Sequence, residues 1–244
     1  KIKFGWPSWA KFVRNSATCV GAITSIIPSK ALLAAGKAAH HVAGNPIMGI
    51  SGSAAKVDFA TTKAHVAEVI ATIAPHDSVE RFKELGVTVI RERARFSGRN
   101  KVQSTTYHVT SRYIVIATGS TPMIPPISGL DKTPFQTNET IFSDTEKPDH
   151  LLIVGGGPIG IEMAQAHARL GCRVTVIEAA TIMGRDDAEL VEILKTRLID
   201  EGIKLVEGAG VTKVAKSKVG VTATLTNGAV ITASQLLVAV GRKP

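Results

Sequence analysis

Cysteine is scarce in this sequence: Cys19 and Cys172 are the only two among 244 residues. Two cysteines are too few for a disulfide framework, and the scarcity favours a reducing cytoplasm. No apolar run is long enough to cross a bilayer. The basic first stretch, KIKFGWPSWAKF, has no apolar segment ending in a cleavage site. The sequence therefore predicts a cytoplasmic protein with neither a membrane span nor a secretory signal.

A dense run of lysine and arginine is also missing, although the formal net charge is +9. This charge has two interpretations: attraction to nucleic acid or another acidic surface, or basic residues scattered over a solvated surface. We find no DNA-reading motif, so we favour the second interpretation and expect no nucleic-acid partner. No metal site is predicted either. The hydrophobic content of 44% is ordinary for a globular protein with a core.

The strongest organisational signal is a repeated order of segments. Gly86–Phe96 and Gly202–Val214 each begin with a glycine and an apolar strand, and short alternating segments follow. Buried strands at Tyr113–Pro122 and Leu236–Pro244 then close each series at a Gly and a Pro. Such repetition indicates two related units. Apolar runs such as YIVIA and LLVAV are typical of strands covered on both faces.

The second unit has a complete front half. Strand patterns occur at Leu151–Val154 and Arg173–Glu178, and helical patterns at Ile161–Leu170 and Asp186–Gly202. Alternating strands and helices predict a doubly wound parallel sheet. The predicted fold class is therefore α/β, with two Rossmann-like units, the first incomplete, each carrying a small antiparallel meander.

The first unit has helices in place of that front half. Pro28–Gly44 is Ala-rich, with Pro at its start and Gly at its end, as helices prefer. Val57–Gly86 is typical of one long helix that Pro75 kinks or breaks. His40 and His41 end the first helix, where a cation suits the helix dipole, and we interpret them as structural.

A glycine fingerprint follows the strand at Leu151–Val154. Gly155, Gly157 and Gly160 stand directly after that strand and open a helix, which is the context that dinucleotide binding requires. In this motif the first glycine allows a tight turn, the second lets the backbone approach a pyrophosphate, and the third lets the helix pack closely on the strand. Free amides at the helix start, around Pro158 and Ile159, then face the phosphates.

An acid at the end of the next strand indicates which nucleotide binds. Glu178 can accept hydrogen bonds from ribose hydroxyls and would repel a 2′-phosphate, which predicts NAD(H) rather than NADP(H). The alternative is a Gly-rich turn in a non-binding Rossmann domain, which the agreement of strand, glycines, helix and acid disfavours. Glu162 stands in the first helical turn, where capping and a functional role are both open.

Four motifs together carry a family resemblance. They are IPSKALL (Ile27–Leu33), IATGSTP (Ile116–Pro122), GGGPIGIEMA (Gly155–Ala164) and AVGRKP (Ala239–Pro244). In their order and approximate spacing the chain resembles the FAD-dependent pyridine nucleotide–disulfide oxidoreductases. The Ala-rich helix after PSK is most similar to the mercuric reductase and dihydrolipoamide dehydrogenase branch.

The resemblance implies FAD beside NAD(H), and roles for several residues. Lys30 matches the family lysine beside the flavin, where it would stabilise negative charge, and Glu162 matches its ion-pair partner. Gly241 lies in a second loop, near the nicotinamide side. The segment that contacts FAD in the family is matched by Ala117, Thr118 and Gly119.

The cysteine region departs from the family pattern. The family reads roughly GGTCxNxGCxPSK, with two redox cysteines. Cys19 resembles the first but stands two residues too far from Pro28, and Ile26 occupies the place of the second. Cys19 is thus a catalytic candidate without its partner. Cys172, beside a strand of the other unit, is interpreted as a small buried hydrophobe.

The resemblance also divides the chain. Residues 1–149 match a partial FAD-binding domain, with a helical segment at 28–86 and a meander at 87–122, but without the N-terminal FAD fingerprint. Residues 150–244 match the NAD(H)-binding Rossmann domain. The C-terminal domain through which the family forms homodimers has no counterpart here.

The function that the resemblance implies is an FAD-dependent NAD(H) oxidoreductase of the disulfide-reductase type. Hydride would pass from NADH to the flavin and then to a small-molecule disulfide or a metal ion. Two alternatives stay open. One is an NAD(H)-binding module without redox competence, and the other is a cysteine-independent diaphorase that reduces a quinone.

Overall fold

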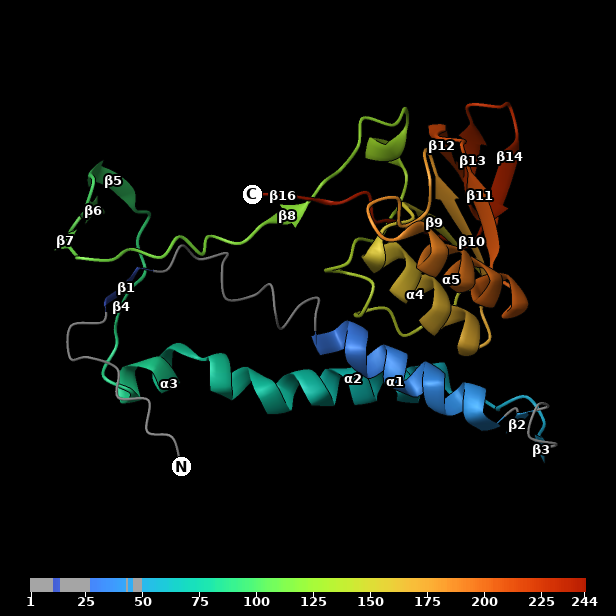
Figure 1. The fold of residues 1–244 in the computed structure, drawn as a ribbon, viewed down its shortest axis with the longest axis horizontal. Helices are drawn as coiled ribbons and strands as arrows, with labels where there is room; N and C mark the ends of the chain where they lie inside the picture. Colours follow the sequence, from blue (N-terminus) through green and yellow to red (C-terminus); the bar gives the residue numbers. More distant parts are fainter. Residues whose placement is uncertain (1–10, 14–26, 43, 46–49) are drawn as a thin grey trace.

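The computed structural model describes residues 11–13, 27–42, 44–45 and 50–244. Within them a four-stranded parallel sheet, in the order β11–β10–β9–β15, organises the second half of the chain (Figure 1). Its strands are β9 (His150–Val154), β10 (Arg173–Glu178), β11 (Lys204–Glu207) and β15 (Gln235–Val238). The connecting helices are α4 (Pro158–Arg169) and α5 (Ala188–Asp200). The predicted α/β class is confirmed.

The central strand β9 is apolar from Leu151 to Val154 because both of its faces are covered. Leu151 and Ile153 of β9 join a core cluster that contains side chains of α4 and α5 and of the N-terminal helices. Leu152 and Val154 join a second cluster with the C-terminal meander. Because successive side chains of a strand point to opposite faces, two covered faces require an unbroken apolar run.

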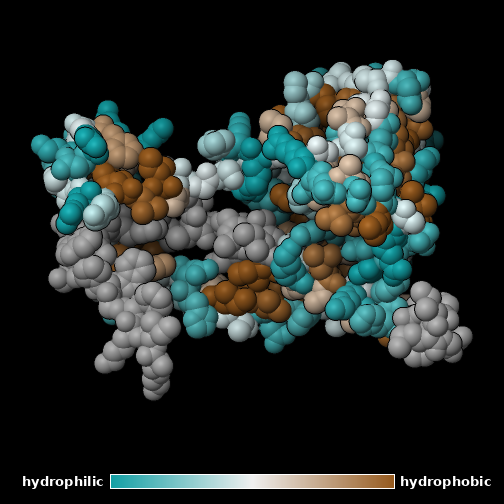
Figure 2. Space-filling model, viewed as in Figure 1, coloured by the Kyte–Doolittle hydropathy of each residue, from teal (hydrophilic) through white to brown (hydrophobic). Residues whose placement is uncertain are grey.

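Two antiparallel meanders are present, as predicted. The first consists of β5 (Arg95–Gly98), β6 (Lys101–Gln103) and β7 (His108–Thr110), and the second of β12 (Val211–Ser217), β13 (Gly220–Leu225) and β14 (Val230–Ala233). The first lies far from the parallel sheet in Figure 1. Its residues Phe96 and Tyr107 are exposed, and Figure 2 shows hydrophobic surface at that end of the molecule.

Helices dominate the part of the chain before the first meander. They are α1 (Ile27–Val42), α2 (Phe59–Ile73), the short 3₁₀ helix η3 (Ala74–Asp77) and α3 (Val79–Glu84). Pro75 lies in η3, so the long helical pattern is broken where the missing N–H of proline predicts. The side chains of Asp58 and Ser78 cap α2 and α3. Among the described residues, no helix is long and apolar enough to cross a membrane.

Short pairings complete the structure. A parallel pair joins β1 (Lys11–Val13) to β4 (Thr88–Ile90), and antiparallel pairs join β2 (Gly44–Asn45) to β3 (Ile50–Ser51) and β8 (Thr121–Pro122) to β16 (Arg242–Lys243). A second 3₁₀ helix, η4 (Leu130–Lys132), packs near β12.

The buried strand expected at Tyr113–Pro122 is wrong for most of its length. Only its last two residues form a strand, β8. Tyr113 and Val115 are 69% and 86% exposed. A strand needs a neighbour that pairs with its backbone N–H and C=O groups, and the described residues place no strand beside residues 113–120.

A close helix crossing joins α1 to α4. A Cβ at Gly36 would lie 3.2 Å from the carbonyl oxygen of Ala166, so a glycine suits this crossing. α2 packs on α1 and contributes the buried residues Phe59, Lys63 and Val66. The crossing therefore connects the N-terminal helices to the domain that holds the parallel sheet.

A lysine is buried in this junction. Lys63 is 3% exposed, and its Nζ donates a hydrogen bond to the carbonyl oxygen of Ile141 at 2.6 Å. Burial lowers the pKa of Lys63 to about 8. His167 is also buried, its Nδ1 donates to the carbonyl oxygen of Met163 at 2.8 Å, and burial lowers its pKa to about 4. At neutral pH the junction thus contains an ammonium and an uncharged imidazole.

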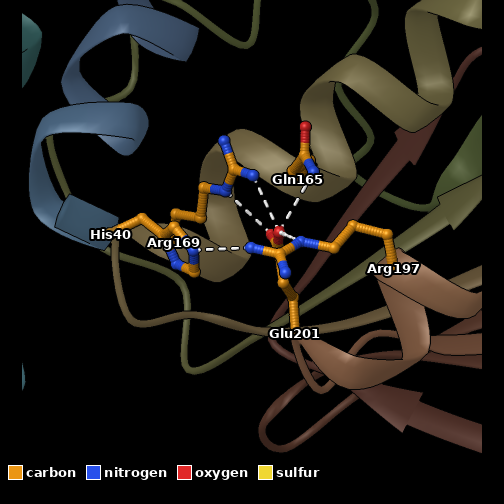
Figure 3. Close-up of polar contacts among 5 residues, drawn as sticks. All are labelled: His40, Gln165, Arg169, Arg197 and Glu201. Carbon is orange, nitrogen blue, oxygen red and sulfur yellow. Dashed lines mark hydrogen bonds and ion pairs between the residues drawn. The ribbon is translucent and has the colours of Figure 1, made fainter. Parts of the chain in front are cut away.

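An ion-pair network holds the C-terminal ends of α1, α4 and α5 together (Figure 3). The carboxylate of Glu201 accepts from Arg169 at 2.8 and 2.7 Å, from Arg197 at 2.7 Å and from Gln165 at 3.4 Å. Nη2 of Arg197 also donates to Nε2 of His40 at 2.7 Å. Because a guanidinium has no acceptor, this nitrogen of His40 carries no proton, and burial lowers the pKa of His40. His40 thus takes part in this network as a neutral acceptor and not as the cation that the helix dipole would favour.

The buried Lys63 predicts a specific pH dependence of stability. Its folded pKa is about 8 and its ordinary value is 10.5, so between these values the unfolded chain holds a proton that the folded chain has lost. The free energy of unfolding therefore rises with pH across this window. From pH 7 to pH 11 we expect the free energy of unfolding of wild type to increase by about 3 kcal/mol relative to that of Lys63→Met. Urea unfolding followed by circular dichroism measures it.

The exposed Lys83 provides the control. The variant Lys83→Met should follow the wild-type curve at every pH. A Lys63→Met curve parallel to the wild type through the same window would show that burial does not destabilise the ammonium.

Candidate functional site

The glycine turn between β9 and α4 lies at the carboxyl edge of the parallel sheet. Gly155 has φ +115°, a conformation that favours glycine. A Cβ at Gly160 would overlap the carbonyl oxygen of Gly155, so only glycine lets α4 start this close to β9. A Cβ at Gly157 would meet nothing within 4 Å. The turn is therefore tight, closely packed and open on one side, as a dinucleotide phosphate site requires.

The start of α4 has no side-chain cap. Gly157 is its N-cap residue, with extended backbone, and Pro158 is its first helical residue. The first N–H groups of a helix lack partners within the helix, and here the amide of Ile159 is among them. Uncapped amides and the positive end of the helix dipole make this turn a fitting place for an anion.

Glu178 at the end of β10 lies across the glycine turn. Its Oε2 accepts a hydrogen bond from the N–H of Gly156 at 2.7 Å, and its Oε1 accepts from the N–H of Ala180 at 3.0 Å. A carboxylate has about four lone-pair sites, so these two bonds fix its orientation and leave acceptor capacity for ribose hydroxyls. Its partial exposure gives a ligand access to it.

Lys30 and Glu162 form an ion pair between α1 and α4. Nζ of Lys30 donates to Oε1 of Glu162, and the side chains are 60% and 32% exposed. The structure thus brings together two residues that are 132 positions apart in the chain. Their predicted part in catalysis stays a prediction.

The other two predicted cofactor segments lie next to each other. Gly119 and Gly241 both have positive φ, +72° and +116°, and they flank the β8–β16 pair. Arg242 joins them: its Nε donates to Oγ of Ser120 at 2.8 Å, and its Nη2 forms an ion pair with Glu139 at 3.0 Å. Ala117 and Thr118, which precede Gly119, are exposed.

The glycine turn belongs to the same end of the sheet. A Cβ at Gly155 would overlap the backbone of Ala239 and Val240, which lead directly to Gly241. The structure therefore brings the fingerprint next to the start of the second loop, and the β8–β16 pair joins that loop to the predicted flavin segment.

The cysteines offer no thiolate in the described part of the chain. Cys172 is 6% exposed, and burial raises its pKa to about 11. It is a buried thiol, as predicted. Cys19 and Ile26 lie outside the described residues.

Several residues at this edge were not predicted from the sequence. Arg242, Glu139 and Ser120 form the link described above. Arg242 and Ser120 lie within the AVGRKP and IATGSTP motifs, but no role was predicted for either residue, and no motif contains Glu139. Glu207 at the end of β11 accepts from the N–H of Ile182 at 2.7 Å. The sequence marks Glu207 only as an acid at the end of β11, as Glu178 is at the end of β10.

Comparisons with known proteins agree with this geometry. The family described as "Pyridine nucleotide-disulphide oxidoreductase" matches residues 16–244. A mercuric reductase of Lysinibacillus sphaericus is 33% identical over 234 residues, which are 93% of this chain and 42% of the relative. A mercuric reductase of Streptomyces lividans is 32% identical over 238 residues, which are 94% of this chain and 50% of the relative.

Solved structures with a similar fold include two chains that are each about twice as long as this one. The Cu(II) complex of the HOCl-induced flavoprotein disulfide reductase RclA from Escherichia coli matches with a TM-score of 0.79 and 25% identity, over 98% of this chain and 52% of that one. LpdA of Mycobacterium tuberculosis shares the fold, with a TM-score of 0.80. The chain spans about half, or less, of each of these four proteins. Because the family match covers nearly the whole chain, the protein belongs to the pyridine nucleotide-disulphide oxidoreductase family.

Proposed function

We propose that this chain is the NAD(H)-binding part, together with a flavin-facing surface, of an FAD-dependent oxidoreductase of the disulfide-reductase type. The observation that carries the proposal is the glycine turn with Glu178 bonded across it. The relatives are named mercuric reductase and flavoprotein disulfide reductase, which supports the reaction class. The scarcity of cysteine favours a cytoplasmic location.

The nucleotide contacts follow from the turn. Open space beside Gly157 admits the diphosphate, and the first amides of α4, including that of Ile159, donate to it. Pro158 sets the first helical φ without adding an N–H. Glu178 accepts from the ribose hydroxyls and disfavours a 2′-phosphate. Gly241 lies on the nicotinamide side.

A flavin site would adjoin this one. FAD, when bound, would supply the two-electron chemistry between NADH and an acceptor. Lys30, oriented by Glu162, would place a positive charge beside the isoalloxazine, and residues 117–119 would contact the flavin. A donor without a partner supports a ligand here: Nη1 of Arg242 is buried and has no hydrogen bond among the described residues.

The electron acceptor is proposed to be a metal ion or a small-molecule disulfide, as the names of the relatives suggest. One observation favours a second candidate, an NAD(H)-binding module without thiol chemistry. Cys172, the cysteine that the structure describes, is buried with a raised pKa and cannot supply a thiolate at neutral pH. Disulfide or metal-ion reduction that depends on Cys19 would exclude this candidate.

Reversing the charge at Glu178 should change nucleotide binding. Glu178→Arg removes the ribose acceptor and its bond to Gly156, and it adds a charge that attracts a 2′-phosphate. We expect NADH to bind about tenfold more weakly, and the preference over NADPH to disappear. Fluorescence titrations with both nucleotides measure this. Glu189→Arg makes the same charge change at an exposed site and should bind like wild type; equal NADH affinity in all three proteins would contradict the assignment.

Removing the charge of Glu162 should affect flavin reduction more than stability. The ion pair is partly exposed, so Glu162→Gln should lower the free energy of unfolding by less than about 1 kcal/mol. NADH-dependent bleaching of the flavin absorbance, after FAD is added, should slow about tenfold because Lys30 loses its orientation.

A matched variant is Glu84→Gln, which breaks the exposed pair with Arg81. It should leave the bleaching rate unchanged. The same bleaching rate in Glu162→Gln and wild type would refute a flavin role for the Lys30–Glu162 pair.

A further inference from the structure

The turn of residues 179–184 forms one wall of the glycine turn. Ile182 is fully buried, and a Cβ at Gly156 would lie 2.7 Å from its Cγ1. The N–H of Met183 donates to the carbonyl oxygen of Gly156 at 2.9 Å. We call residues 179–184 the outer turn. Any shift of the outer turn would move the backbone against which the nucleotide is proposed to lie.

Carboxylates from two neighbouring strands hold the outer turn. Glu178 and Glu207 are register partners at the ends of β10 and β11. Glu178 accepts from the N–H of Ala180 at 3.0 Å, and Oε1 of Glu207 accepts from the N–H of Ile182 at 2.7 Å. The two acids thus bind alternate amides of the same turn.

Glu207 is itself held by α5. Its Oε2 pairs with Nζ of Lys195 at 3.0 Å, and that nitrogen also binds Glu192 at 3.0 Å. The side chain of Lys195 is only 13% exposed. One oxygen of Glu207 thus binds the turn and the other binds α5, so its carboxylate links the turn to that helix.

The backbone of the turn is strained. Met183 has φ +51°, and among the described residues it is the one non-glycine with positive φ. Such a conformation persists only where the surroundings impose it, and it is frequent at ligand sites. The hydrogen bonds of Ile182 to Glu207 and of Met183 to Gly156 impose it here.

We propose that Glu207 is a positioning residue for NAD(H): through the amide of Ile182 it fixes the outer turn, so that Glu178 and the glycine turn are preorganised for the adenosine ribose and the diphosphate. This inference rests on the proposed NAD(H) site. It adds a residue that acts through the turn rather than by contact with the nucleotide. Preorganisation of this kind raises affinity because the turn need not be ordered on binding.

Titrations of the whole chain with NADH test the proposal. Glu207→Ala should bind about tenfold more weakly, since a charge-assisted hydrogen bond to the turn is lost. Glu207→Gln keeps an acceptor for Ile182 and should stay within about twofold of wild type. Glu192→Gln removes the other partner of Lys195, leaves the turn untouched and should match wild type. Amide hydrogen exchange at Ile182, without nucleotide, should speed up in Glu207→Ala alone.

The outcomes separate the two claims. If wild type binds no NADH, the proposed function fails and this inference with it. If wild type binds but Glu207→Ala binds equally well, or Glu207→Gln loses as much as Glu207→Ala, only the positioning role is overturned. If Glu207→Ala does not fold by circular dichroism, Glu207→Asp, too short to keep the same bond to Ile182, takes its place with the same expected loss.

Discussion

The close approach of α4 to the end of β9 is the constraint on which the rest of this structure depends. The overlap that any side chain at Gly160 would cause with Gly155 restricts this crossing to glycine. Once α4 starts there, its uncapped amides face the open side of the turn at Gly157. The same start places Glu162 on the first turn of the helix, where it meets Lys30. One backbone contact thus positions both the proposed phosphate site and the ion pair beside the proposed flavin site.

α4 also connects the two halves of the chain. It packs against α1 at Gly36 and contributes the buried His167, which lies near the buried Lys63. Its last turn joins the network around Glu201. A shift of α1 against α4 would therefore move Lys30 relative to Glu162. The positioning of the proposed redox groups depends on helix packing as much as on the loops that contact cofactors.

Local patterns in the sequence predicted the part of the fold that depends on local interactions. The strands and helices from Leu151 to Glu178, both meanders and the break at Pro75 follow from periodicity, glycine and proline, and the structure contains them all. The strand expected at Tyr113–Pro122 is mostly absent because strand formation depends on a neighbour that sequence patterns do not supply. The helix dipole is a local feature and would favour a cation at His40, whereas Arg197, which makes His40 an acceptor, is 157 residues away.

The candidate site divides in the same way. The glycines and Glu178 have a motif whose spacing is fixed, so they could be identified in advance. Glu207 and Glu139 act through hydrogen bonds to residues 25 and 103 positions away, and no spacing rule marks such pairs. Buried groups such as Lys63 are also invisible in a helical pattern, because a lysine there is ordinarily solvated.

If the open side of the glycine turn receives the diphosphate of NAD(H), the substitution Gly157→Ala should block that site. The added methyl group would meet no protein atom within 4 Å, and φ at this residue is −78°, so folding should be unchanged. We predict an unaltered urea midpoint and NADH binding weakened at least about tenfold, because the methyl group occupies the space of the phosphate. Unchanged NADH affinity in a folded Gly157→Ala protein would show that the diphosphate does not lie on this side of the turn.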